Sequence, residues 1–170
     1  MLKNTNPFLE RIAIEESLTE DDKFRVVKDA NPLDEDHYLV YTKENYSSFA
    51  DVCANDLVQF LESKVNFLLS DGYILVERGR GESCTGGKVI HAHAHIVPVK
   101  YKDSIISKLG EPDFTLVAEG GVNELLEKSI KFPLYVLVFS NSLRGSLYKL
   151  NSSLKKSVIR NIISRADVAK

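Results

Sequence analysis

The stretch His91-Ala92-His93-Ala94-His95-Ile96-Val97-Pro98 decides how this chain is interpreted. Successive side chains of a β-strand point to opposite faces, so the three imidazoles would share one face and Ala92, Ala94 and Ile96 the other. Same-face neighbours lie roughly 6.5 Å apart, close enough for adjacent imidazoles to serve one phosphate-sized group. The chain has only four histidines, and three fall in this stretch. We therefore expect a strand from Val89 to Val97, ended by Pro98, with its chemistry on one face.

The rest of the pattern predicts an α+β fold with a mainly antiparallel sheet, one long helix and one C-terminal helix. The long helix is expected from Ser47 or Ser48 to Ser70, because apolar residues recur at steps of three and four and Gly72 follows as a stop. Cys53 is assigned to its core face. Strands are expected at 24–27, 37–41, 73–76 and 134–139, short helices at 103–109 and 122–129, a glycine-rich loop at 77–88, turn residues at Arg144 and Gly145, and a final amphipathic helix from Ser152 or Ser153.

Composition indicates a soluble single domain with a real core. The 170 residues are 44% hydrophobic and 27% charged, and the net charge of −2 provides no global field that would recruit nucleic acid or anionic membrane. Two cysteines cannot build a disulfide framework. We see no apolar signal core, no run long enough to span a bilayer and no internal repeat, so a cytoplasmic location is expected.

Three uses of the histidines are open on residue chemistry alone. Imidazole can attack a phosphoryl group without a metal and form a labile phosphoramidate, while its neighbours orient it and move protons. A zinc or iron site could instead take two strand histidines and His95, His37 or Glu77 as third ligand, although roughly 13 Å of backbone separates the outer pair. A purely structural role on a solvated strand face is the third interpretation. We favour the first, with no metal and no required cofactor.

The motif resembles the signature of the histidine-triad (HIT) superfamily of nucleotide hydrolases and transferases. The resemblance extends over roughly 24–100: a strand, the turn Asn31-Pro32, then Asp36-His37 where the family usually has Gly-His, the long helix and the next strand. It implies a HIT-like core at 23–100, an N-terminal segment at 1–22 and a C-terminal extension at 101–170 packed on the same domain.

The resemblance also implies roles for individual residues. His93 would be the nucleophile on the α-phosphate of a nucleotide, His95 would contact the phosphate or the leaving group, and His91 and His37 would orient the network. Backbone groups of Gly86, Gly87, Lys88 and Val89 would hold phosphate oxygens, and the opening strand at 24–27 and the Asn31 region would line the base and ribose pocket. Family members often pair through the long helix and a neighbouring strand, which makes a homodimer an expectation.

Two departures from the family pattern leave the substrate open. Gly87 and Lys88 stand where many HIT enzymes carry a Gln and a Ser or Thr. An inward Lys88 would favour a more anionic substrate, whereas an outward one is a surface lysine. Arg78 and Arg80 could likewise reach phosphates, but we expect them in solvent. The alternative function is therefore a nucleotide-binding protein whose catalysis has decayed.

Overall fold

The computed structural model describes residues 16–79 and 91–151. Its elements follow the chain in this order: β1 (Ser17–Glu20), β2 (Phe24–Lys28), β3 (Tyr38–Thr42), the 3₁₀ turn η1 (Phe49–Asp51), α2 (Ala54–Phe60), the π-helical segment η2 (Leu61–Val65), α3 (Asn66–Ser70), β4 (Tyr73–Gly79), β5 (His93–Pro98), η3 (Val99–Tyr101), α4 (Lys102–Leu109), β6 (Phe114–Gly121), α5 (Val122–Ser129), β7 (Tyr135–Phe139), η4 (Asn141–Leu143) and β8 (Arg144–Leu150). The α+β class is confirmed.

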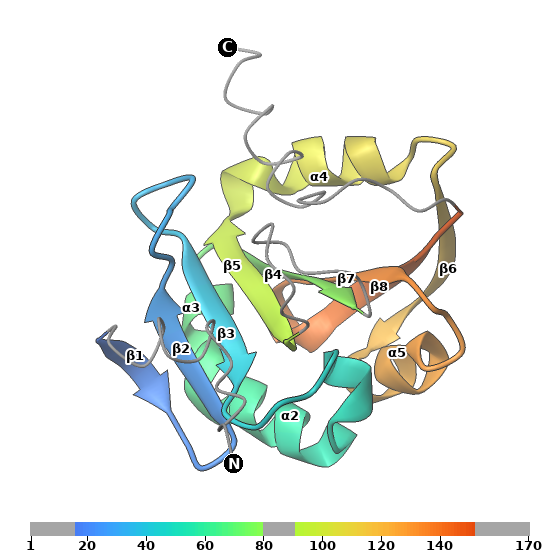
Figure 1. The fold of residues 1–170 in the computed structure, drawn as a ribbon. Helices are drawn as coiled ribbons and strands as arrows, with labels where there is room; N and C mark the ends of the chain where they lie inside the picture. The colour runs from blue at the N-terminus through green and yellow to red at the C-terminus, as the bar shows by residue number, and fades with distance from the viewer. Residues whose placement is uncertain (1–15, 80–90, 152–170) are drawn as a thin grey trace, which may run out of the picture.

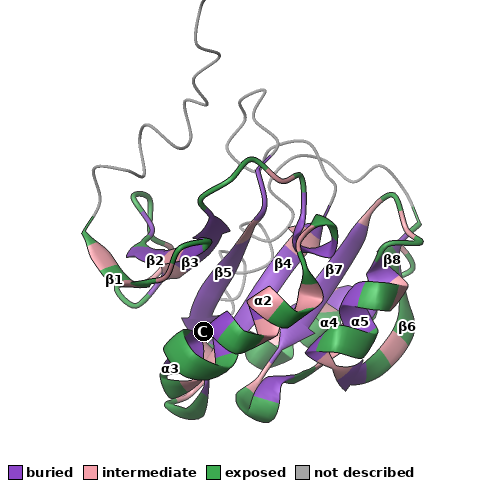
Figure 2. Ribbon diagram, turned by 90° about the horizontal axis from the view of Figure 1, so that it is seen from below, coloured by how far each residue is buried: buried purple, intermediate pink, exposed green. Residues whose placement is uncertain are grey.

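One antiparallel sheet joins the eight strands of the described residues, in the order β1-β2-β3-β5-β4-β7-β8-β6. Figure 1 shows α2 and α5 on one side of this sheet and α4 on the other. The larger apolar core lies under α2, α3 and α5, and a second core lies under α4. The middle strands β5, β4 and β7 are the most deeply buried part of the molecule, whereas the helices expose their outer surfaces (Figure 2). No helix of the described ranges has the length and apolar character needed to cross a membrane.

The alternation expected around the histidines is confirmed. Ala92, Ala94 and Ile96 are at most 1% exposed and belong to the larger core. His93 and His95 project from the opposite face of β5, because the residues of a strand alternate between its two faces. The strand starts at His93 rather than Val89; positions 89 and 90 lie outside the described residues.

The other expected elements are found with shifted ends. The long helix starts at Ala54 after a separate 3₁₀ turn, and Cys53, expected in the core, is exposed at its N-cap. β4 continues to Gly79, three residues into the expected loop. Strands β1, β6 and β8 were not expected, and Arg144 and Gly145 begin β8 rather than forming a turn. The expected C-terminal helix falls outside the described residues.

The sheet contains one β-α-β-β arrangement twice, although the sequence shows no repeat. In the first, β3 is followed by the long helix, β4 and β5, and the spatial order of its strands is β3-β5-β4. In the second, β6 is followed by α5, β7 and β8, with the order β6-β8-β7. Both helices pack into the same core, and the two units meet where β4 pairs with β7. Both edges of β4 are therefore occupied by strands of its own chain.

Candidate active site

His93 is the accessible member of the cluster. His37, His91 and His95 are buried, with 0%, 5% and 2% of their surface exposed, whereas His93 is half-buried. Its Nδ1 lies 2.8 Å from the carbonyl oxygen of His91. A carbonyl can only accept, so Nδ1 carries the hydrogen and Nε2 carries a lone pair. When the ring is neutral, this contact leaves Nε2 as its nucleophilic nitrogen.

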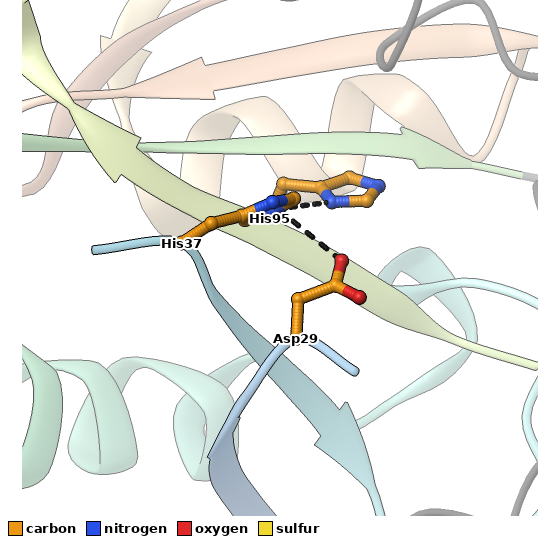
Figure 3. Close-up of side chains that lie close together, drawn as sticks. All are labelled: Asp29, His37 and His95. Carbon is orange, nitrogen blue, oxygen red and sulfur yellow. Dashed lines mark hydrogen bonds and ion pairs between the residues drawn. The ribbon is translucent and has the colours of Figure 1, made fainter. Parts of the chain in front are cut away.

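His37 and His95 form a directed hydrogen-bond chain behind His93. The backbone N–H of Leu33 donates to Nδ1 of His37 at 3.2 Å, which leaves the ring hydrogen on Nε2. This Nε2 lies 2.9 Å from Nδ1 of His95 and donates to it (Figure 3). The hydrogen of a neutral His95 is consequently on Nε2. The ring centroids of His93 and His95 are 5.5 Å apart, so His95 offers a donor next to the nucleophile.

Asp29 completes this cluster and was not found in the sequence. Its carboxylate is 5% exposed and lies 3.5 Å from Nε2 of His37, where it favours the N–H on that nitrogen. The backbone N–H of Asn31 donates to the same carboxylate at 2.9 Å. Asp29 directly follows β2, whose partner β3 begins after His37. The position of Asp29 at the end of a strand that pairs with the strand after His37 could have been inferred from the sequence. The hydrogen bond from the Leu33 N–H to His37 could not.

Asp29, His37 and His95 each offer one ligand atom within 4.8 Å of the others, which is short enough for a metal ion. The hydrogen-bond pattern does not suit one. A metal on Nε2 of a neutral His37 requires the ring hydrogen on Nδ1, and the N–H of Leu33 already points at that atom. These contacts instead determine which ring nitrogen of His37 and His95 carries the hydrogen. Glu77, the other suggested ligand, is on the opposite face of the sheet, beside Phe49 and Tyr135.

His91 holds the backbone before β5 through its own hydrogen bonds. Its Nε2–H donates to the carbonyl oxygen of Thr42 at 2.6 Å, and its ring stands edge-on to Tyr41. Burial lowers the pKa of His91, so the ring is neutral near pH 7. The next residue, Ala92, donates its N–H to the carbonyl oxygen of Tyr46 at 2.7 Å. These contacts position the His91 carbonyl that orients His93.

The remaining expected site residues are divided between two regions. Asn31 is exposed in the loop between β2 and β3, next to Asp29. Gly86, Gly87, Lys88 and Val89 lie outside the described residues. The structure thus brings together His93, His95 and His37, adds Asp29, and leaves His91 in a supporting position.

A buried carboxylate lies beneath the histidine strand. Glu77 is 1% exposed, and burial raises its pKa to about 7. It accepts the backbone N–H of Phe49 at 2.7 Å and the hydroxyl of Tyr135 at 3.2 Å, while that hydroxyl accepts the N–H of Ala50 at 3.3 Å. These bonds tie η1 to β4 and β7. The chain before η1 contains Tyr46, which holds Ala92, so Glu77 indirectly supports the site.

The site is thus an accessible imidazole on a central strand, held by the His91 carbonyl and backed by the hydrogen-bonded pair His37 and His95. No family model matches the chain. An uncharacterized HIT-like protein of Methanocaldococcus jannaschii is 31% identical over 102 residues, covering 54% of this chain and 74% of that protein. The chain belongs to the HIT superfamily.

Solved structures give weaker similarities. A HIT family hydrolase from Clostridium thermocellum is 24% identical, covering 58% of this chain and 92% of that one, with a TM-score of 0.44. A DUF4931 family protein from Bacillus cereus is 15% identical, covering 91% of this chain and 100% of that one, with a TM-score of 0.49. The family assignment rests on the archaeal sequence.

Proposed function

We propose that the protein is a nucleotide hydrolase or nucleotidyl transferase that attacks an α-phosphate through a covalent nucleotidyl-His93 intermediate. The observation that carries the proposal is the hydrogen bond from Nδ1 of the half-buried His93 to the His91 carbonyl, which leaves the lone pair of the neutral ring on Nε2. Membership of a superfamily that includes nucleotide hydrolases and transferases supports the substrate class. Dinucleoside polyphosphates, nucleoside phosphoramidates and related adenylated compounds fit this chemistry.

The reaction takes two displacements at phosphorus. In the first, Nε2 of His93 bonds to the α-phosphorus in line with the leaving group, whose bond to phosphorus breaks. The Nε2–H of His95 donates to the phosphate or to the leaving group, which stabilises the charge that develops there. In the second, the oxygen of water or of another acceptor hydroxyl bonds to phosphorus and its proton is released to solvent, while the P–N bond breaks and its electron pair returns to Nε2 of His93. The chain's own groups suffice for both steps, so we propose that no metal or cofactor is required.

The test is turnover of diadenosine tetraphosphate and adenosine 5′-phosphoramidate, with AMP as the measured product. His93→Ala should lower kcat/KM by at least about 1,000-fold, since the nucleophile is lost. Cys53→Ser, at an exposed thiol outside the site, is the control and should leave the rate unchanged. Intact-mass analysis of quenched reactions should show one nucleoside monophosphate on the wild type and none on His93→Ala.

Equal turnover by wild type and His93→Ala would refute the covalent mechanism. AMP binding by the wild type without turnover of any adenylated substrate would establish the binding protein with decayed catalysis instead. A rate lost on chelation and restored by zinc or manganese would establish the metal enzyme.

A further inference from the structure

Arg78 occupies a position that the sequence interpretation assigned to a loop. It is the sixth residue of β4, and the neighbouring same-face residues Ile74 and Val76 belong to the core under α4. Val136, its partner across the β4–β7 ladder, belongs to the same core. The side chain of Arg78 therefore projects from the face of the sheet that carries His93 and His95.

The register of the sheet places Arg78 beside the nucleophile. The β4–β5 ladder pairs Val76 with His95 and Glu77 with Ala94. The ladder pairs residues up to Glu77 and Ala94, and continuing the same register by one step aligns Arg78 with His93, each within its strand. Directly opposed residues of an antiparallel pair have Cβ atoms about 5 Å apart on one face. At this spacing an arginine side chain is long enough to reach a phosphoryl group bonded to Nε2 of His93.

The environment makes this charge effective. Arg78 is half-buried, and its Nε and Nη1 atoms are screened from solvent. Two charges attract each other more strongly at a site that is screened from water, because the effective dielectric constant is lower there. The planar guanidinium also matches two phosphate oxygens at once, which a lysine cannot do.

We infer that Arg78 is a further catalytic residue of the proposed reaction, binding the non-bridging oxygens of the phosphate that His93 attacks. The inference rests on the proposed function for its substrate. Arg78 would neutralise the phosphate in the bound state and stabilise the negative charge of the five-coordinate transition state. It requires an anionic α-phosphate and contributes nothing to the recognition of base or ribose.

The experiment compares AMP with adenosine in calorimetric titrations, and adds turnover of diadenosine tetraphosphate. Arg78→Met keeps the aliphatic stem and should weaken AMP binding about 10- to 100-fold, with adenosine binding unchanged within about twofold. Arg78→Lys should lose less, since it keeps the charge without the planar fork. The matched control is Arg144→Met: Arg144 is exposed at the start of β8, which β4 and β7 separate from β5, so AMP binding should persist.

Equal losses for AMP and adenosine in Arg78→Met would show a structural role and overturn the inference. Unchanged AMP binding and turnover in both Arg78 variants would overturn it too, while the proposed function stood. A wild type that neither binds AMP nor turns over an adenylated substrate would remove the proposed function and this inference together.

Discussion

At the scale of single residues, the site is organised by which ring nitrogen carries the hydrogen. Two backbone groups make that choice: the His91 carbonyl accepts from Nδ1 of His93, and the Leu33 N–H donates to Nδ1 of His37. The first leaves a lone pair on the nucleophile, and the second passes through His37 to leave a donor on His95. Histidines on one strand thus acquire different tautomers, and the groups that set them are backbone amides, which do not titrate.

This arrangement predicts the tautomers directly. Long-range ¹H–¹⁵N correlation spectra at a pH where the rings are neutral should show His93 with its hydrogen on Nδ1, and His37 and His95 with theirs on Nε2. His37→Phe removes the donor to His95 and should leave His95 a mixture of tautomers, with turnover reduced about 10- to 100-fold. A wild-type His95 with its hydrogen on Nδ1 would contradict the proposed chain of hydrogen bonds.

Glu77 predicts a pH dependence of stability. Its folded pKa of about 7 exceeds the ordinary glutamate value of 4.5, so between these pH values the folded state keeps a proton that the unfolded state has released. The stabilising contribution of the neutral carboxyl is present below about pH 4.5 and is lost as the pH rises through 7. The loss is about 3 kcal/mol for a shift of this size.

Urea unfolding at several pH values between about 4.5 and 8 measures this effect. Glu77→Gln keeps a neutral acceptor for Phe49 and should remove the extra decline relative to the wild type. Glu77→Ala, which leaves the N–H of Phe49 without this acceptor, should be destabilised at every pH. Parallel pH curves for wild type and Glu77→Gln would show that Glu77 is ionised throughout.

At the scale of elements, β4 organises the site from both faces. It places Arg78 on the face that carries His93 and His95, and Glu77 on the face that packs under α2, α3 and α5. The strand ends at Gly79, which pairs with Tyr135 of β7. Gly79 is opposite Tyr135, and a Cβ at this position would overlap the tyrosine ring. The absence of a side chain therefore lets Tyr135 reach Glu77.

Gly79→Ala should consequently destabilise the protein by about 1–3 kcal/mol, because Tyr135 has to move out of a filled core. The displaced ring also weakens the link to Glu77, so turnover should fall more than global unfolding explains. Gly121→Ala is the control, since a Cβ there meets nothing within 4 Å, and its cost should stay below about 1 kcal/mol. The measurements are the thermal unfolding temperature and kcat/KM of both variants. Equal losses in Gly79→Ala and Gly121→Ala would contradict the packing argument.

The elements also show what the sequence could and could not predict. Strong periodicity predicted β2, β3, β7, α4 and α5 to within a residue or two. Edge strands were missed because β6 exposes Leu116 and Val117 together, which breaks the alternation that identifies a strand. In the site, the histidine spacing predicted His93 and His95 as neighbours. Asp29 and Arg78 depend on strand ends and register, which a single sequence leaves undetermined.

At the scale of the whole molecule, the second β-α-β-β unit closes the edge of β4. The homodimer expected from family resemblance stays a prediction, but the strand that follows the long helix is already paired with β7. Within residues 16–79 and 91–151, the outer strands left for a dimer built by strand pairing are β1 and β6. The cytoplasmic location likewise stays a prediction.

The shared core predicts that residues 23–100 and the extension after them unfold together. Leu57 of α2 and Leu137 of β7 are both 0% exposed and belong to one apolar cluster, although they come from different halves of the chain. Leu57→Ala and Leu137→Ala are chemically identical changes and should each cost about 2–5 kcal/mol. Far-ultraviolet and tyrosine near-ultraviolet circular dichroism should give a single coincident transition in each variant, at a lower urea midpoint with the wild-type m-value. A second transition in Leu137→Ala, with the first half still folded, would mean that the extension is an independent domain.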